Sequence, residues 1–392
     1  MEDRRNCPIC SATGAVSLGV RHDVPILMNR LYDSAKAGQE AARGPLDLVG
    51  CQNCGFVWNA SFEPDLIRYD GDYENDQTHS PAFAQHFRER AQDIAASRPQ
   101  MEDLSYLEIG CGQGRFIEEV ASVAGARLSS AEGFDPAWRG EDGTGPAGAR
   151  IHTCYFDSAT AGRQVRQPNV VASRHTIEHV PDPVAFLRTI ASALGADSKA
   201  TLFIETPCVE WILRNEAMQD FFYEHCSLFT AGSLTHALQA SDFCNVEVQH
   251  VFGGQYLWAR AEASGTAAPV PSLTAETRIG LEGVRSQFLK RWRTHVLKRA
   301  EQGKIAIWGA GAKGVAFALM LDPEARIFDH VIDINPAKQN KHVPGNGLQV
   351  LSPAEAAQRE PKTIYVMNPV YLPEIQDTVK QVGIAADLVS IN

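Results

Sequence analysis

A chain of 392 residues with 44% hydrophobic residues is long enough for two or three domains with separate cores. Its formal net charge of −11 argues against a nucleic-acid partner, because general binding of nucleic acid depends on clustered cations. No run of 18 apolar residues occurs, and no apolar signal segment follows the charged N-terminus, so we expect a cytoplasmic protein without a membrane partner.

Residues 1–75 contain two CxxC pairs, Cys7 with Cys10 and Cys51 with Cys54. In a reducing compartment we do not expect a disulfide framework, and two such pairs present four thiolates to a tetrahedral ion. Four thiolates leave no coordination position for water or substrate. We therefore predict a small domain over residues 1–75 with a structural Zn²⁺, against the alternative of free thiols or a redox pair.

Helical patterns alternate with short apolar runs from residue 82 onward, beginning with a helix expected over 82–97. This alternation predicts an α/β domain with a central sheet over residues 76–262. The small, polar, proline-containing stretch 262–272 is expected to be a linker. A long helix and a second, shorter α/β unit follow, which predicts a C-terminal Rossmann-like domain over residues 273–392.

A glycine-rich loop follows the apolar strand YLEI, in which Glu108 is the acidic residue. The loop carries Gly110, Gly112 and Gly114 and leads into a helix. Glycines let the chain turn sharply and let a ligand lie against bare backbone at a helix N-terminus. The next strand ends in EGFDP, where Asp135 is placed to accept hydrogen bonds from both hydroxyls of a ribose.

These features resemble those of the class I S-adenosylmethionine-dependent methyltransferases. The resemblance implies that Glu108 and the three glycines hold the methionine end of S-adenosylmethionine and that Asp135 holds the ribose. Asp157, after the run CYF, is the predicted adenine contact. The alternatives are a packing turn with a surface Asp135, and NAD binding, which the GxGxG spacing disfavours.

The segment SRHTIEHVPDP places His175, Glu178 and His179 in the HxxEH pattern of inverted zinc peptidases. We interpret this match as accidental, because the motif follows the apolar strand NVVAS and two prolines end any helix. A similar EHVxDP segment follows the fourth strand of methyltransferases. We predict that His175 lines the cofactor or substrate side and that His179 makes a structural hydrogen bond; the alternative is that neither takes part in chemistry.

The stretch FFYEHCSLFT, residues 221–230, places aromatic residues before Glu224 and His225. A core does not accept an adjacent carboxylate and imidazole unless both are satisfied, so the stretch predicts a pocket wall that carries a base. FIETP followed by YEHCSLFT is similar to the connection that carries a glutamate–histidine pair in the zinc-containing sugar C-methyltransferases of deoxysugar biosynthesis. The resemblance covers nearly the whole chain, from the paired CxxC to the C-terminal GAGAKG and DINPAKQNKHVPG.

The resemblance implies methylation of a carbon α to a ketone in a small-molecule substrate, a nucleotide-linked keto-deoxysugar. Carbon becomes nucleophilic only when a base removes its proton and a donor stabilises the enolate oxygen. His225 is the predicted base, Glu224 orients it, and Tyr223 donates to the oxyanion, with Tyr73 from the segment 69–80 as a further pocket residue. The alternative for Glu224 and His225 is a hydrogen bond at the start of a helix without a catalytic role.

Two departures from the resembled family leave the acceptor open. Phe222 stands where the family tends to have tyrosine, and FGGQYLW (252–258) stands where it has a polar HGGS-like segment. They favour a second hypothesis, an O- or N-methyltransferase that acts on another glycan or small metabolite. A third is a zinc scaffold that binds S-adenosylmethionine without turnover.

A second glycine-rich loop, GAGAKG, contains Gly309, Gly311 and Gly314, and Asp333 ends the next strand. The pattern alone is a dinucleotide fingerprint, which keeps an NAD-dependent oxidoreductase as a further alternative. Too few residues remain for two complete mononucleotide halves, and the resembled family does not use this domain with NAD. A local basic loop, for which we expect contact either with a nucleotide diphosphate or with solvent, contains Lys338, Lys341 and His342.

Overall fold

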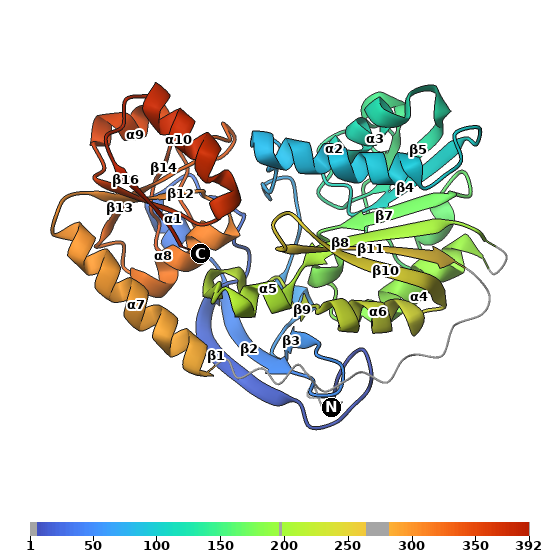
Figure 1. Cartoon of the computed structure of the whole chain (residues 1–392), viewed down its shortest axis with the longest axis horizontal. Coiled ribbons are helices and arrows are strands. Elements are labelled where there is room, and N and C mark those ends of the chain that lie inside the picture. The colour runs from blue at the N-terminus through green and yellow to red at the C-terminus, as the bar shows by residue number, and fades with distance from the viewer. Residues whose placement is uncertain (1–5, 196–197, 264–281, 392) are drawn as a thin grey trace.

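The computed structural model describes residues 6–195, 198–263 and 282–391, which form three β-sheets (Figure 1). The linker predicted over 262–272 lies outside the described residues from residue 264 onward. The largest hydrophobic core contains buried residues from all three sheets, such as Val49, Ile204 and Val331. In the described part of the chain, no helix has the length and hydropathy needed to cross a bilayer.

The N-terminal sheet is antiparallel, with the strand order β1-β2-β3-β9. Its strands are β1 (Val16–Pro25), β2 (Arg43–Gly50), β3 (Val57–Asn59) and β9 (Ser227–Leu228), accompanied by α1 (Ala35–Gln39) and the 3₁₀ helix η1 (Pro64–Leu66). The short strand β9 comes from the centre of the chain, outside the predicted module of residues 1–75. It begins two residues after His225, so the N-terminal sheet holds one end of the FFYEHCSLFT stretch in place.

The central sheet has seven strands in the order β10-β11-β8-β7-β4-β5-β6. Five strands are parallel, whereas β10 and β11 form an antiparallel edge beside β8. The strands are β4 (Leu104–Ile109), β5 (Leu128–Phe134), β6 (Arg150–His152), β7 (Val170–Arg174), β8 (Thr201–Pro207), β10 (Phe243–Val251) and β11 (Tyr256–Ala263). The helices are α2 (Pro81–Ala96), α3 (Arg115–Ala124), α4 (Pro183–Leu194), α5 (Val209–Arg214) and α6 (Ala231–Gln239).

Local sequence explains where the helices of this unit begin. Ser80 caps α2 by accepting a hydrogen bond from the Phe83 amide, and Pro81 occupies the first helical position. Asp182 likewise caps α4 by accepting a hydrogen bond from the Ala185 amide, and Pro183 occupies the first helical position. The HTIEH segment before it therefore forms only a single 3₁₀ turn, η5 (Ile177–His179). Further 3₁₀ turns are η2 (Gly125–Arg127), η3 (Pro146–Gly148), η4 (Ala161–Arg163) and η6 (Met218–Asp220). The predicted α/β fold is confirmed.

The C-terminal sheet is fully parallel, with the order β14-β13-β12-β15-β16. Its elements are α7 (Glu282–Ala300), β12 (Ile305–Trp308), α8 (Ala312–Leu321), β13 (Phe328–Ile332), β14 (Val350–Leu351), α9 (Pro353–Arg359), β15 (Thr363–Val366), η7 (Pro369–Tyr371), α10 (Leu372–Gln381) and β16 (Asp387–Ser390). In Figure 1 this unit stands beside the central unit, and the N-terminal strands β1 and β2 run below them. An ion pair of 3.0 Å between Lys313 of α8 and Asp220 of η6 joins the two units.

Candidate active site

A first cavity of about 850 Å³ opens at the carboxyl ends of β4, β5 and β7. In a parallel sheet the carboxyl ends of neighbouring strands and their loops meet at one edge, where ligands bind. The predicted cofactor residues that line it are Glu108, Gly110, Gly112, Asp135 and His175. The structure therefore brings together five of the seven residues predicted for S-adenosylmethionine.

The three glycines of the first loop have different structural roles. At Gly110, with φ of +76°, a Cβ would lie 2.0 Å from Thr176 Oγ1, so no larger residue fits. Gly114 has φ of +70°, caps the start of α3 and does not line the cavity. Gly112 has φ of +54°, and a Cβ there would meet no protein atom within 4 Å. The loop is therefore packed at Gly110 and open at Gly112, where a ligand can approach the backbone.

Asp135 is held towards the loop by backbone amides. Gly112 N donates to Asp135 Oδ2 at 2.7 Å, and Ala137 N donates to Oδ1 at 2.7 Å. Burial raises the pKa of Asp135, although the two amides oppose this shift. A carboxylate oxygen has more than one acceptor position, so Asp135 can still accept hydrogen bonds from ribose hydroxyls.

Glu108 is a buried carboxyl group, with 2% of its surface exposed. Burial raises its pKa to about 8, although the Arg174 guanidinium opposes this shift. Its Oε2 has no hydrogen-bond partner among the described residues. A buried carboxyl group with a free acceptor suits a positively charged ligand, since a cation would offset the cost of ionising it. This fits S-adenosylmethionine, which carries an ammonium and a sulfonium group.

Asp157 does not line the cavity. Its Oδ1 accepts hydrogen bonds from the amides of Ala159 and Thr160, both at 2.9 Å, in an exposed turn. The preceding aromatic residues Tyr155 and Phe156 line the cavity instead. The predicted contact of Asp157 with the cofactor is therefore not what the geometry shows, because its own turn holds the carboxylate outside the cavity.

A second cavity of about 240 Å³ lies between the central and C-terminal units. It is lined by Tyr73, by His175, His179, Phe222 and His225 of the central unit, and by residues of the second glycine loop. Tyr73, His175 and His179 line both cavities. Asn75, Asp76 and Gln77 also line both, so the two spaces meet along these six residues.

His225 faces the second cavity and is the predicted base. Its ring centroid lies 4.7 Å from that of His179 and 4.1 Å from that of Phe222. Burial lowers the pKa of His225 well below its usual value, and His179, His175 and Lys313 contribute to this shift. Its Nδ1 has no hydrogen-bond partner in the described part of the chain. The imidazole is therefore neutral near pH 7 and has a nitrogen free for proton transfer.

Glu224 lies behind His225 and does not line either cavity. Its Oε1 accepts a hydrogen bond of 3.0 Å from Met28 N, and burial raises the pKa of its carboxyl group to about 7. Among the described residues no hydrogen bond joins this carboxyl group to the His225 ring. The side chain anchors the stretch to the N-terminal unit, so the predicted direct orientation of His225 by the Glu224 carboxylate is not what the geometry shows.

Tyr223 points away from both cavities, so the structure does not place it where an oxyanion would form. Its hydroxyl accepts a hydrogen bond of 2.9 Å from Glu63 N, and its ring packs on Phe62 at 5.4 Å. Tyr73 lines both cavities, and its hydroxyl accepts a hydrogen bond of 3.2 Å from Asn29 Nδ2. Burial raises the pKa of Tyr73 well above 10, and the Glu224 carboxyl group, with which its hydroxyl interacts, adds to this shift, so Tyr73 keeps its proton.

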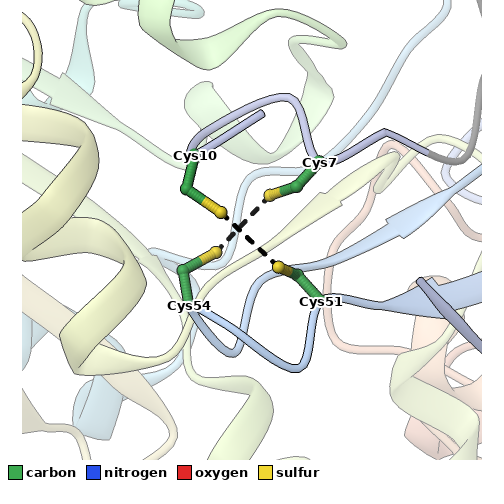
Figure 2. A group of neighbouring side chains, drawn as sticks. All are labelled: Cys7, Cys10, Cys51 and Cys54. Carbon is green, nitrogen blue, oxygen red and sulfur yellow. Dashed lines mark hydrogen bonds between the residues drawn. The ribbon is translucent and has the colours of Figure 1, made fainter. Parts of the chain in front are cut away.

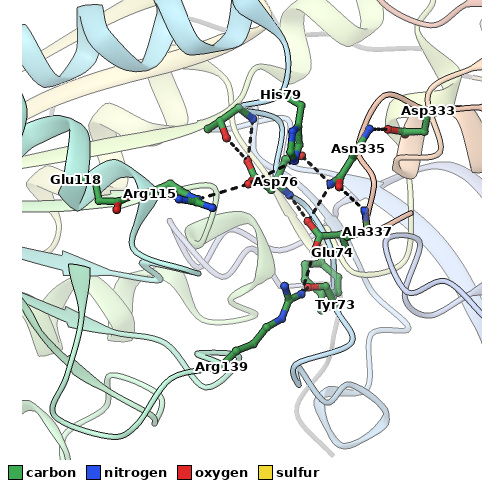
Figure 3. A network of polar contacts seen from close by, with 11 residues as sticks. Tyr73, Glu74, Asp76, His79, Arg115, Glu118, Arg139, Asp333, Asn335 and Ala337 are labelled. Carbon is green, nitrogen blue, oxygen red and sulfur yellow. Dashed lines mark hydrogen bonds and ion pairs between the residues drawn. The ribbon is translucent and has the colours of Figure 1, made fainter. Parts of the chain in front are cut away.

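The segment from Tyr73 to His79 forms the wall between the cavities, and Figure 3 shows how it is held on both sides. Glu74 pairs with Arg139 at 3.0 Å and accepts a hydrogen bond of 3.1 Å from Asn335 Nδ2. Arg115, at the start of α3, lies 3.8 Å from Asp76. Because Arg139 and Arg115 belong to the cofactor side and Asn335 to the C-terminal unit, the segment ties the two sides together.

A buried ion-pair network that the sequence reasoning missed supports the floor of the site. Arg174 Nε donates to Glu205 Oε2 at 2.7 Å, and His86 contacts the other carboxylate oxygen. Burial alone would raise the pKa of Glu205, but Arg174 and His86 lower it below its usual value. The Arg174 guanidinium also lies 4.0 Å from the centroid of the Phe116 ring. Arg174 ends β7 in the segment SRH, and Glu205 lies two residues before the end of β8 in the segment FIETP.

The second glycine loop repeats the geometry of the first. Ala310 N donates to Asp333 Oδ2 at 2.7 Å and Asn335 N donates to Oδ1 at 2.8 Å, as Gly112 and Ala137 do to Asp135. Lys338 lines the second cavity with 5% of its surface exposed, and no ion pair to it occurs among the described residues. A nearly buried ammonium group beside a glycine loop suits an anionic ligand.

The four cysteines of the two CxxC pairs converge (Figure 2). The Sγ atoms of Cys7 and Cys54 are 3.4 Å apart, and those of Cys10 and Cys51 are 3.6 Å apart. Tetrahedral zinc with Zn–S bonds of about 2.3 Å requires S–S separations of about 3.8 Å. The donor set and its spacing therefore fit a structural Zn²⁺, which would be closed to water and substrate.

Comparison with known proteins agrees with this arrangement. A family described as a methyltransferase domain matches residues 77–248, and a family described as a C-methyltransferase C-terminal domain matches residues 282–386. The C-methyltransferase NovU of Streptomyces niveus is 26% identical over 408 residues, which covers 96% of this chain and 92% of that protein. The ubiquinone biosynthesis O-methyltransferase of Parvibaculum lavamentivorans is 32% identical over 121 residues, 29% of this chain and 47% of that protein.

Solved structures align with less of the chain. The CurJ carbon methyltransferase covers 43% of this chain and 50% of its own, with 14% identity and a TM-score of 0.31. An O-methyltransferase family protein from Burkholderia thailandensis has 10% identity and a TM-score of 0.36, and covers 46% of this chain and 56% of its own. The chain is an S-adenosylmethionine-dependent methyltransferase that joins a methyltransferase domain to the C-terminal domain of the C-methyltransferases.

Proposed function

We propose that the protein methylates a carbon α to a ketone in a nucleotide-linked keto-deoxysugar. The observation that carries this proposal is the meeting of the two cavities along six shared residues, which include Tyr73 and His175. His225, whose Nδ1 has no hydrogen-bond partner among the described residues, lies on the acceptor side. Methylation of carbon needs a base, because carbon has no lone pair until its proton is removed. A half-buried, neutral histidine that lines the cavity fits that requirement.

The first cavity would hold the methyl donor. Glu108 is suited to its positive end, the open backbone at Gly112 to close approach, and Asp135 to its ribose. When bound, S-adenosylmethionine supplies an electrophilic methyl group on a positively charged sulfur. The chain's part is to hold that methyl group in line with the acceptor carbon, and in-line positioning contributes much of the rate in such displacements.

The second cavity would activate the acceptor. The C–H bond next to the ketone breaks, its proton moves to the free nitrogen of His225, and the electron pair delocalises onto the ketone oxygen. Tyr73 keeps its proton and accepts a hydrogen bond from Asn29. Its hydroxyl also interacts with the Glu224 carboxyl group, so it would turn from Glu224 to donate to the ketone oxygen. Phe222 and Tyr256 wall the cavity and limit water, which strengthens each contact.

A nucleotide diphosphate would occupy the side of the second cavity formed by the C-terminal unit. Lys338 supplies a nearly buried positive charge. Asp333 holds the same position in the second loop as Asp135, the proposed ribose contact, holds in the first. The helix α8 begins at Ala312, so its N-terminus faces the same space. These features support an acceptor that carries a nucleotide.

Two observations favour the alternative, an O- or N-methyltransferase that acts on another small molecule. Phe222 has no hydroxyl to assist an enolate, although it contacts the His225 ring. Gln255, in the FGGQYLW segment, accepts a hydrogen bond of 2.9 Å from Lys313 and donates one of 2.8 Å to Asn368. An acceptor would therefore meet different polar groups here than in the HGGS-like segment of the resembled family. On an oxygen or nitrogen acceptor, His225 would only need to accept a proton.

The experiment measures dTDP binding by calorimetry in the presence of saturating S-adenosylhomocysteine. We expect binding that Lys338→Met weakens by roughly 10- to 100-fold, the value of a hydrogen bond to a charged group. Lys341→Met is the matched control, because Lys341 is more exposed and lies 3.8 Å from Asp33 at the surface. Equal effects of the two substitutions, or no dTDP binding to the wild-type protein, would contradict a nucleotide-linked sugar as the acceptor.

A further inference from the structure

Three side chains of the second cavity form a cluster of metal-ligand type that is separate from the four cysteines. Glu178, His179 and His225 each place one ligating atom within 4.8 Å of the other two. All three line the cavity between the central and C-terminal units. Two imidazoles and one carboxylate are a common donor set for Zn²⁺, Co²⁺ and Ni²⁺.

His179 is already oriented as a metal ligand. Its Nδ1 lies 3.0 Å from the backbone oxygen of Glu224, and a carbonyl oxygen can only accept a hydrogen bond. We therefore assign the ring proton to Nδ1, with the Tyr69 hydroxyl oxygen, 2.7 Å away, as a second acceptor. The lone pair is then on Nε2. Metal-binding histidines generally donate their other N–H to a carbonyl or carboxylate in this way.

Glu178 and His225 both have an unused acceptor. Glu178 is fully buried, its Oε2 accepts a hydrogen bond of 3.1 Å from Thr206, and its Oε1 has no hydrogen-bond partner among the described residues. The ion-pair contact nearest to Oε1 is His175 Nδ1 at 3.4 Å. His225 Nδ1 also has no partner. Buried acceptors without donors are rare in folded proteins, and a cation would satisfy both.

We propose that Glu178, His179 and His225 bind a divalent transition-metal ion of the Zn²⁺ class, and that this ion competes with the acceptor. Three protein ligands leave further coordination positions open towards the cavity. The ion would take the lone pair that His225 needs to accept a proton, so its binding inhibits turnover. The inhibition rests on the proposed function, whereas the binding of the ion does not.

The test is a Co²⁺ titration of the full chain, followed by visible absorption, with the cysteine site already filled by Zn²⁺. We expect one further equivalent of Co²⁺ with a spectrum of nitrogen and oxygen ligands and without thiolate charge-transfer bands. Glu178→Gln, which retains an acceptor for Thr206, and His179→Asn should each weaken this binding at least 10-fold. The thermal unfolding midpoint of each variant without metal serves as the check of folding.

A second cluster on the chain provides the matched control. Cys208, Glu210 and His250 also place ligating atoms within 4.8 Å of one another, near the surface. His250→Ala should leave the further equivalent intact. Loss of Co²⁺ in this variant alone, or no further equivalent in the wild-type protein, would overturn the proposal. Anomalous diffraction from Co²⁺-soaked wild-type crystals locates the ion without any substitution, and none of these readouts depends on the acceptor.

Discussion

Replacing Gly112 by Ala is the most informative perturbation of the cofactor cavity. Gly112 has φ of +54°, and an added Cβ would meet no protein atom within 4 Å. The substitution therefore costs the folded protein only the left-handed backbone conformation, about 1 kcal/mol. Because Gly112 lines the cavity, the methyl group would occupy space next to the bound cofactor.

The size of the effect follows from the contact that Gly112 makes. To make room for a methyl group, either the ligand or the loop must move, and a moved loop loses the 2.7 Å hydrogen bond from Gly112 N to Asp135. A hydrogen bond to a charged group contributes about 1.5–3 kcal/mol, so S-adenosylhomocysteine should bind roughly 10- to 100-fold more weakly. Calorimetry measures the affinity, and the unfolding midpoint measures the cost to folding.

Gly383→Ala is the matched control. Gly383 has φ of +76°, an added Cβ there meets no atom within 4 Å, and the residue follows α10 outside both cavities. It should cost a similar amount of stability and leave the affinity for S-adenosylhomocysteine unchanged. Equal affinities of the two variants would refute the placement of the cofactor against the first glycine loop.

Four further outcomes are expected. Cys7→Ser should lower the zinc content measured by atomic absorption and lower the unfolding midpoint, because it removes one of four thiolates. Burial keeps the pKa of His225 well below 6.5, so kcat/KM should show no loss from its protonation between pH 6.5 and 8 and should fall only at lower pH, as the base gains a proton. Tyr223→Phe should cost about 1 kcal/mol in chemical unfolding with kcat unchanged, whereas Tyr73→Phe should lower kcat by about 100-fold. Arg174→Met should destabilise the fold by about 3–5 kcal/mol, because it leaves a buried carboxylate without its counter-ion.

The sequence was sufficient for features that depend on local order along the chain. The strand–glycine–helix pattern placed Gly110, Gly112 and Asp135 correctly at one cavity, because a strand, a turn and a helix fix the direction of the loop between them. The two CxxC pairs likewise brought four sulfur atoms together. In both cases the relevant contacts follow from spacing.

Features that depend on tertiary packing were not predictable in this way. Whether Tyr223 or His225 faces the cavity depends on how β9 joins the N-terminal sheet, and nothing in FFYEHCSLFT encodes that pairing. Asp157 is turned away by hydrogen bonds to its own turn. The ion pair between Arg174 and Glu205 joins two strands that are distant in sequence, so neither motif indicated its partner.

The two glycine loops have the same hydrogen-bond pattern in different units of the protein. In each loop a backbone amide donates to an aspartate 23 residues later in the chain, Asp135 in the central unit and Asp333 in the C-terminal unit. The segment from Tyr73 to His79 lies between them and contacts both. On the proposed function, one unit would hold the methyl donor and the other would hold part of the acceptor.

The most direct test of the account is the position of the transferred methyl group. The protein would be incubated with a dTDP-linked keto-deoxysugar and S-adenosylmethionine carrying a ¹³C-labelled methyl group, and the product would be examined by NMR. We expect the label on a ring carbon next to the ketone in the wild-type reaction and no methylated product with His225→Ala. A label on oxygen or nitrogen, or unchanged turnover by His225→Ala, would contradict the assignment of a carbon acceptor activated by this histidine.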